Sequence, residues 1–133
     1  MEPIPFKGIS MQPLLKDGDL VIIEKISAKI SLGDVLLFKD SLNGEFVVHR
    51  VIQERPLITK GDWAILSEAP KGEEVFARVI GFRREGRSYS FSKGFLLGLY
   101  LFFSKKLLSP VRIFRQISRV ALIMTAPLLF TKD

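Results

Sequence analysis

Residues 33–52 read GDVLLFKDSLNGEFVVHRVI and contain two apolar, β-rich runs on either side of an Asn-Gly pair. Asn43 and Gly44 both tolerate the positive φ that a type I′ turn requires, so the stretch predicts a β-hairpin. Similar runs lie at 20–23 (LVII) and 75–82 (VFARVIGF). Short strands separated by Gly and Asp are typical of an antiparallel sheet or barrel.

Two Gly-Asp pairs, Gly18-Asp19 and Gly33-Asp34, lie just before apolar runs. Glycine supplies an unusual φ, and the aspartate side chain bonds nearby backbone amides. We interpret both pairs as turn chemistry without a catalytic role.

The pattern becomes helical from Ser92 onward, with apolar residues recurring on one broad face. Pro110 then begins a second helix, because its missing N–H costs nothing in the first turn. The fold predicted is mainly β, followed by two C-terminal α-helices. We divide the chain into a β domain, residues 1–91, and a basic, apolar helical extension, residues 92–133.

The basic charge is concentrated in the C-terminal part of this 133-residue chain, whose net charge is +6. Residues 1–81 hold 10 Lys and Arg against 12 Asp and Glu, whereas residues 82–133 hold 10 against 2. A basic and apolar segment favours a membrane surface over nucleic acid. Arg112, Arg115 and Arg119, on one helix face, would meet anionic headgroups. The alternatives are packing of the helices on each other or on the β domain, and binding of a partner.

No run reaches the roughly 18–20 apolar residues of a spanning helix, and the first residues lack a signal-peptide pattern. We therefore expect a cytoplasmic protein, peripheral at the inner membrane surface. The absence of cysteine excludes disulfides and a cysteine nucleophile. With a single histidine as well, no metal and no cofactor is expected.

The candidate chemistry rests on Ser10 and on His49, the only histidine. A serine hydroxyl needs a base to become a nucleophile. Gly8 and Pro13 shape the loop around Ser10, and amides of this Gly8–Met11 loop, that of Ser10 first, are suited to an oxyanion hole. A rigid turn and a structural histidine would look the same, so the residues alone leave both interpretations open.

Five segments, in order and at matching spacing, resemble the boxes of signal peptidase I and the related LexA-type peptidases. Residues 8–23 resemble the nucleophile box, 30–38 the next box, 48–52 the base box, 59–62 the acidic box and 76–81 the closing strand. The resemblance implies the antiparallel β-barrel domain of that superfamily. It also implies a serine endopeptidase that cleaves an extended peptide or precursor protein by acyl transfer.

The base box, His49-Arg50-Val51-Ile52, resembles the histidine type found in archaeal and endoplasmic-reticulum signal peptidases, whereas bacterial and LexA-type members use a Ser–Lys dyad. The resemblance therefore implies that Ser10 attacks and His49 is the general base. Histidine titrates near neutrality, which suits this role. Lys60 would be the base only if it were buried beside Ser10, and Arg50 is interpreted as a structural or substrate-side charge.

The chain departs from the family pattern after Asp62. Asp62 matches the Gly-Asp aspartate of the acidic box, Glu68 stands where the family has its catalytic aspartate, and Trp63-Ala64 replace an Asn pair. Either carboxylate is a candidate to orient His49. The departure also motivates the alternative of a weakly active or inactive peptide- or membrane-binding module with the same fold.

Two further departures concern the start of the chain. Gly8 stands where signal peptidases often have a serine that helps to hold the oxyanion. Because Ser10 lies so close to residue 1, we expect neither an N-terminal membrane anchor nor the DNA-binding domain of LexA-type repressors.

Overall fold

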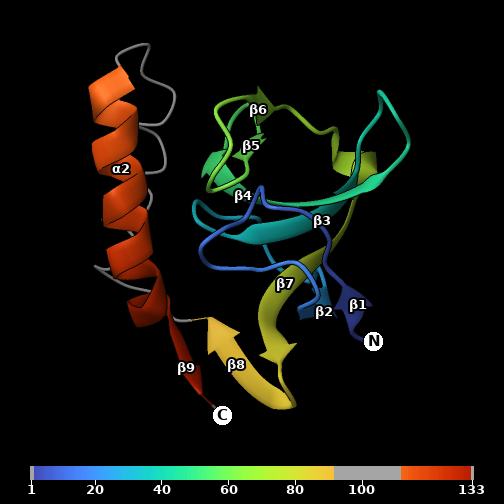
Figure 1. Ribbon diagram of the computed structural model, residues 1–133. Coiled ribbons are helices and arrows are strands. Elements are labelled where there is room, and N and C mark those ends of the chain that lie inside the picture. Colours follow the sequence, from blue (N-terminus) through green and yellow to red (C-terminus); the bar gives the residue numbers. More distant parts are fainter. Residues whose placement is uncertain (1, 92–111, 133) are drawn as a thin grey trace.

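The strands of the computed structural model, which describes residues 2–91 and 112–132, form one antiparallel sheet that curls into a half-barrel (Figure 1). Its mainly β architecture confirms the fold class predicted from the sequence. The strands are β1 (Ile4–Pro5), β2 (Leu20–Lys25), β3 (Val35–Lys39), β4 (Phe46–Gln53), β5 (Ile58–Lys60), β6 (Ser67–Glu68), β7 (Val75–Arg84), β8 (Arg87–Phe91) and β9 (Phe130–Lys132).

The sheet is organised around β7, in the order β1-β2-β7-β3-β4-β5-β6. One edge of β7 pairs with β2, and its other edge pairs first with β3 and then, from Gly81 to Arg84, with β8. The register shifts in β2, β3 and β4. Such irregularities bend strands and increase their twist, which accounts for the curl.

The hairpin predicted at residues 33–52 is present, but its turn differs from the predicted type. β3 pairs with β4 down to Lys39 and Phe46, so the connection is the longer segment 40–45. In this segment Gly44 has φ +71°, whereas Asn43 does not have a positive φ. The Asn43 side chain instead accepts a hydrogen bond from the Glu45 amide at 2.9 Å. A type I′ turn is therefore wrong here, because the strands separate too early for a two-residue loop.

Side chains alternate along β3 between two apolar clusters, as the strand period requires. Val35 and Leu37 point into the main core, whereas Leu36 and Phe38 belong to a smaller cluster on the other face. Both faces of β3 are thus covered. The main core also contains residues from the Ser10 loop, from β2, β4, β7 and from the C-terminal part of the chain: Phe6, Met11, Leu14, Leu15, Val21, Val48, Ala77, Val79, Phe82, Leu122, Ala126 and Leu129.

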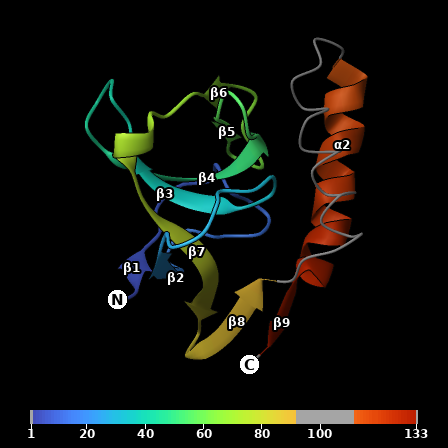
Figure 2. The ribbon, with the colours of Figure 1, turned by 180° about the vertical axis from the view of Figure 1, so that it is seen from behind.

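The C-terminal segment packs against the β strands instead of projecting from them. Helix α2 (Arg112–Thr125) is followed by the 3₁₀ turn η2 (Ala126–Leu129) and by β9, which pairs with β8. Leu122, Ala126 and Leu129 enter the main core. Figures 1 and 2 show α2 standing beside the sheet, with β8 and β9 at its base. Among the alternatives for this segment, packing on the β domain therefore holds for α2.

The first of the two predicted helices lies outside the described residues. In the part of the chain that the structure does describe, no helix has both the length and the apolarity needed to cross a membrane.

The two Gly-Asp pairs have the turn chemistry expected of them. Gly18 and Gly33 have φ of +91° and +89°. Asp19 accepts the Lys16 amide at 2.8 Å, and Asp34 accepts the Ser31 amide at 2.9 Å. Each aspartate also pairs with an arginine of β7, Asp19 with Arg84 and Asp34 with Arg78. The turns are thereby tied to the central strand.

Candidate active site

Ser10 lies in a loop whose shape is fixed on both sides. Gly8 has φ +95°, a conformation that side chains strain to adopt, and its amide donates to Asp17 Oδ1 at 2.8 Å. After Ser10 the chain turns inward, and the Met11 side chain is fully buried in the main core. Ser10 itself is half-buried. The loop therefore presents the Ser10 side chain at the surface from a rigid base.

The Ser10 amide forms no hydrogen bond with any residue described in the structure. Two residues away on either side, the Gly8 amide donates to Asp17 and the Gln12 amide donates to the Ile9 carbonyl. Gly8 carries no hydroxyl, so an oxyanion formed beside Ser10 would depend on backbone donors. The Ser10 amide is placed to be one of them.

His49 is held in β4 by a carboxylate and by an aromatic ring. Its Nδ1 lies 2.9 Å from Glu68 Oε2, and the edge of the imidazole meets Phe38 with ring centroids 6.1 Å apart. The Thr59 hydroxyl donates to the same Glu68 oxygen at 3.1 Å. A carboxylate can only accept, so Nδ1 carries the proton and, in the neutral ring, Nε2 is an acceptor.

Glu68 reaches His49 through the pairing of short strands. β5 pairs with β4 on one side and with β6 on the other, which places Glu68 directly opposite Thr59. The Glu68 side chain is 31% exposed, so it remains partly hydrated. Of the two carboxylates left open by the sequence, Glu68 is the one on His49 Nδ1.

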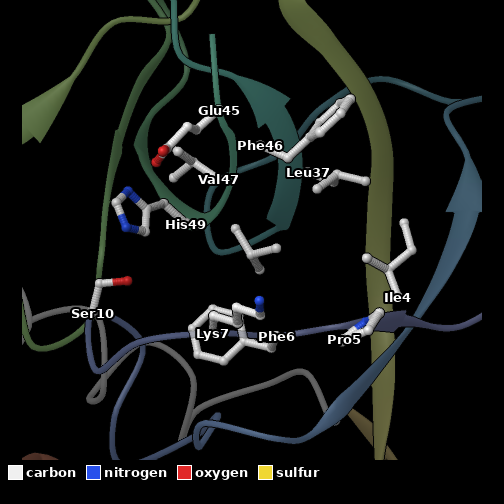
Figure 3. Close-up of a pocket in the computed structure, with 11 residues that line it drawn as sticks. Ile4, Pro5, Phe6, Lys7, Ser10, Leu37, Glu45, Phe46, Val47 and His49 are labelled. Atoms are coloured by element: carbon white, nitrogen blue, oxygen red, sulfur yellow. The ribbon is translucent and has the colours of Figure 1, made fainter. Parts of the chain in front are cut away.

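The free nitrogen of His49 faces Ser10 across Gly61. A methyl group placed on the Gly61 Cα would lie 3.0 Å from both His49 Nε2 and Ser10 Cβ, and 2.5 Å from the Ser10 carbonyl oxygen. Figure 3 shows the Ser10 hydroxyl and the imidazole at the same end of one pocket. No hydrogen bond joins the two side chains within the described structure. The absence of a side chain at residue 61 permits their approach.

The loop after Gly61 binds the back of the Ser10 loop. The Trp63 amide donates to the Ser10 carbonyl at 2.9 Å. The Lys60 ammonium donates to the Ala64 carbonyl at 2.8 Å and also to the Gly61 carbonyl, and this lysine is completely buried. Burial lowers the pKa of Lys60 to about 8. Its bonds to backbone carbonyls show a structural role in fixing the loop next to the site.

Asp62 is engaged elsewhere. Its two carboxylate oxygens accept from Arg50 Nε at 2.9 Å and from Arg50 Nη2 at 3.0 Å, and both side chains are buried. Arg50 also donates to the Gly33 carbonyl at 3.0 Å. This bidentate pair joins β4 to the loop that carries Gly61. Asp62 and Arg50 therefore support the geometry around His49 through backbone placement.

An open pocket of about 340 Å³ extends from the Ser10–His49 pair between the N-terminal strand and the start of β4 (Figure 3). Leu37, Phe46 and Val48 give it an apolar wall, and residues 4–7 form the opposite side. Among the described residues, no group of three or more histidine and carboxylate side chains is placed to hold a metal ion.

The curled antiparallel sheet, with its serine loop, histidine strand and acidic strand, defines a peptidase-like fold. A family model described as Peptidase S24-like matches residues 4–78, more than half of the chain. The chain therefore belongs to the Peptidase S24-like family, which includes serine peptidases. Searches of curated proteins and of solved structures gave no match. The resemblance seen in the sequence is thus confirmed at the level of the family, and the histidine-type subgroup stays a prediction.

Three features of the site were not assigned from the sequence. Thr59 and Gly61 belong to the segment that resembles the acidic box, but neither type of residue signals a role by itself. Arg119 was expected on a face toward headgroups, and the structure instead places its guanidinium over the Trp63 ring, 4.8 Å from the centroid. These roles depend on contacts between distant segments.

Proposed function

We propose that the chain is a serine endopeptidase in which Ser10, His49 and Glu68 act together. The observation that carries the proposal is the 2.9 Å contact between His49 Nδ1 and Glu68 Oε2, with Nε2 turned toward Ser10. The contact fixes the tautomer in which Nε2 can accept the serine proton. Membership of a family that includes serine peptidases supports the same chemistry.

In the proposed reaction the Ser10 oxygen attacks the scissile carbonyl while His49 Nε2 takes its proton. The Ser10 amide stabilises the oxyanion, and Glu68 stabilises the imidazolium. His49 then donates the proton to the leaving amine, which leaves an acyl group on Ser10. Water, deprotonated by His49, hydrolyses this ester and restores the hydroxyl.

The substrate in this proposal is an extended peptide or an unfolded segment of a precursor protein, as in histidine-type signal peptidases. Its backbone would pair with the free edge at residues 4–7, and apolar side chains would enter the pocket lined by Leu37, Phe46 and Val48. The position of β1 at the end of the sheet order leaves that edge available within the described strands.

The test is labelling with a serine-reactive acylating probe, read by mass spectrometry. We expect one label on wild type, at Ser10, and none on Ser10→Ala or His49→Ala. Ser41→Ala, in the exposed loop before β4, is the matched control and should label as wild type does. Folded wild type that stays unlabelled would contradict the proposal and favour a non-catalytic binding module.

We further propose that the chain makes peripheral contact with membranes through α2 and the turn after it. This segment exposes four large apolar side chains, between 51% and 72% each: Val120, Ile123, Met124 and Leu128. Exposed apolar side chains on one helix are the kind that enter the boundary between lipid headgroups and acyl chains. Cosedimentation with anionic vesicles should fall when Ile123 and Met124 are both changed to Ser, and equal binding by this variant would contradict the proposal.

A further inference from the structure

A second pocket, of about 540 Å³, meets the first one at Ser10. It is lined by Ile9, Ser10, Trp63, Ile65, Leu66 and Arg119. Ser10 lines both pockets, and no other described residue does so. A chain that passed over Ser10 from the first pocket would therefore continue into this one.

The walls of the second pocket are unusually apolar for a surface. Ile9 is 62% exposed and Leu66 is 79% exposed, and both are large aliphatic residues beside an aromatic ring. Exposed apolar side chains gathered around a hollow are typical of a binding site. We infer that the apolar wall of this pocket would bind a large apolar side chain.

Among the described residues that line the pocket, only Arg119 is charged. Its guanidinium lies over Trp63, and its Nη2 makes only a long 3.5 Å contact with the Trp63 carbonyl. Its Nε is buried and has no hydrogen-bond partner among the residues that the structure describes. No carboxylate among the described residues forms an ion pair with it. A carboxylate is the group that an arginine binds best, and Arg119 has none among the described residues.

We propose that this pocket is a substrate subsite that takes a large apolar side chain together with a carboxylate, which Arg119 binds. The proposal rests on the proposed function, since it makes the pocket part of the path over Ser10. Arg119 belongs to α2, outside residues 4–78, so this preference would come from a part of the chain beyond the family match. The carboxylate is either an acidic side chain next to the apolar residue or the C-terminus of the peptide.

The test uses the fluorescence of Trp63, the only tryptophan in the chain. Ser10→Ala is titrated with three probes: N-acetyl-phenylalanyl-glutamate amide, the corresponding glutamine amide, and N-acetyl-phenylalanine as the free acid. We expect at least one carboxylate probe to bind about tenfold more tightly than the glutamine amide, the gain expected of a charge-assisted hydrogen bond. Tight binding of the glutamate amide identifies an internal acidic residue, and tight binding of the free acid identifies a C-terminus.

Arg119→Gln should abolish this difference between the carboxylate probes and the glutamine amide. Arg87→Gln, at an exposed position on β8, is the control and should keep the full difference. In the protein that keeps Arg119, added salt should also reduce the difference in affinity between the carboxylate probes and the glutamine amide. This measurement needs no substitution at residue 119. Equal binding of all three probes, or a preference that survives Arg119→Gln, would overturn the subsite.

The outcome is separable from that of the proposed function. Acylation of Ser10 without any carboxylate preference refutes the subsite and leaves the peptidase proposal standing. A carboxylate preference in a protein whose Ser10 is not acylated keeps the pocket as a binding site and refutes the catalytic proposal.

Discussion

Arg50 and Asp62 form a buried bidentate ion pair, with Nε–Oδ1 at 2.9 Å and Nη2–Oδ2 at 3.0 Å. Arg50 directly follows His49 in the sequence, and Asp62 directly follows Gly61. The pair therefore fixes the backbone at both positions. His49 itself is held by Glu68. The two carboxylates that the sequence could not rank therefore have different tasks, and substitution separates them.

Asp62→Asn should destabilise the fold, because it leaves the Arg50 charge buried without its counter-charge. The expected loss is about 3 kcal/mol in the free energy of unfolding. Urea unfolding followed by circular dichroism measures it. A variant as stable as wild type would mean that Arg50 finds compensation elsewhere, and the structural task assigned to Asp62 would be refuted.

Glu68→Gln should lower the rate of Ser10 acylation strongly and the stability of the fold only slightly. The side chain is 31% exposed, so we expect less than about 1 kcal/mol of lost stability. The rate of Ser10 acylation should fall about a hundredfold or more, because an amide neither stabilises imidazolium nor fixes the tautomer. Time-resolved mass spectrometry gives the rate. An unchanged rate in the folded variant would remove Glu68 from the proposed mechanism.

The four long strands could be predicted from the sequence because each is an apolar, β-rich run bounded by Gly or Asp. The curl could not be predicted, since it comes from register shifts such as the one between Ile22 and Ile23. β9 lies within residues 92–133, for which the sequence predicts a helical extension. Its strand conformation depends on pairing with β8, which lies far away in the sequence.

The sequence proposes the residues of the candidate site, whereas their assembly depends on how distant segments pair. Ser10 and His49 were found through the resemblance to family boxes. The choice of Glu68 depends on the pairing that places it opposite Thr59, and no local pattern encodes that register. The contact of Arg119 with Trp63 could not be predicted, because helical periodicity gives a face but not the surface that the face meets.

Gly61→Ala should block the approach of His49 and Ser10. The new methyl group would lie 2.5 Å from the Ser10 carbonyl oxygen, closer than real contacts allow, and 3.0 Å from His49 Nε2. We expect acylation to be lost and the fold to be destabilised by about 1–3 kcal/mol. Gly72→Ala is the matched control, because a methyl group there meets nothing within 4 Å. Wild-type acylation in Gly61→Ala would show that the two side chains do not need this approach.

Lys60 should make the stability of the fold depend on pH above neutrality. The pKa of Lys60 falls from 10.5 to about 8, and burial is the main cause. Asp62 and Glu68 oppose this fall, whereas Arg50 and Arg119 contribute to it. Below pH 8 the amine is protonated in both states, and the cost of burying its charge is constant. Between about 8 and 10.5 the unfolded chain binds the proton and the folded chain does not. The free energy of unfolding therefore rises with pH in this window.

Relative to Lys60→Met, the unfolding free energy of wild type should rise by about 2 kcal/mol from pH 7 to pH 9.5. Urea unfolding at several pH values measures the difference, and the reference variant cancels the titration of the other groups. Lys25→Met, at an exposed position of β2, serves as the control and should show no such rise against wild type. A pH-independent difference for Lys60→Met would mean that the ammonium stays charged, held by the Gly61 and Ala64 carbonyls strongly enough to offset its burial.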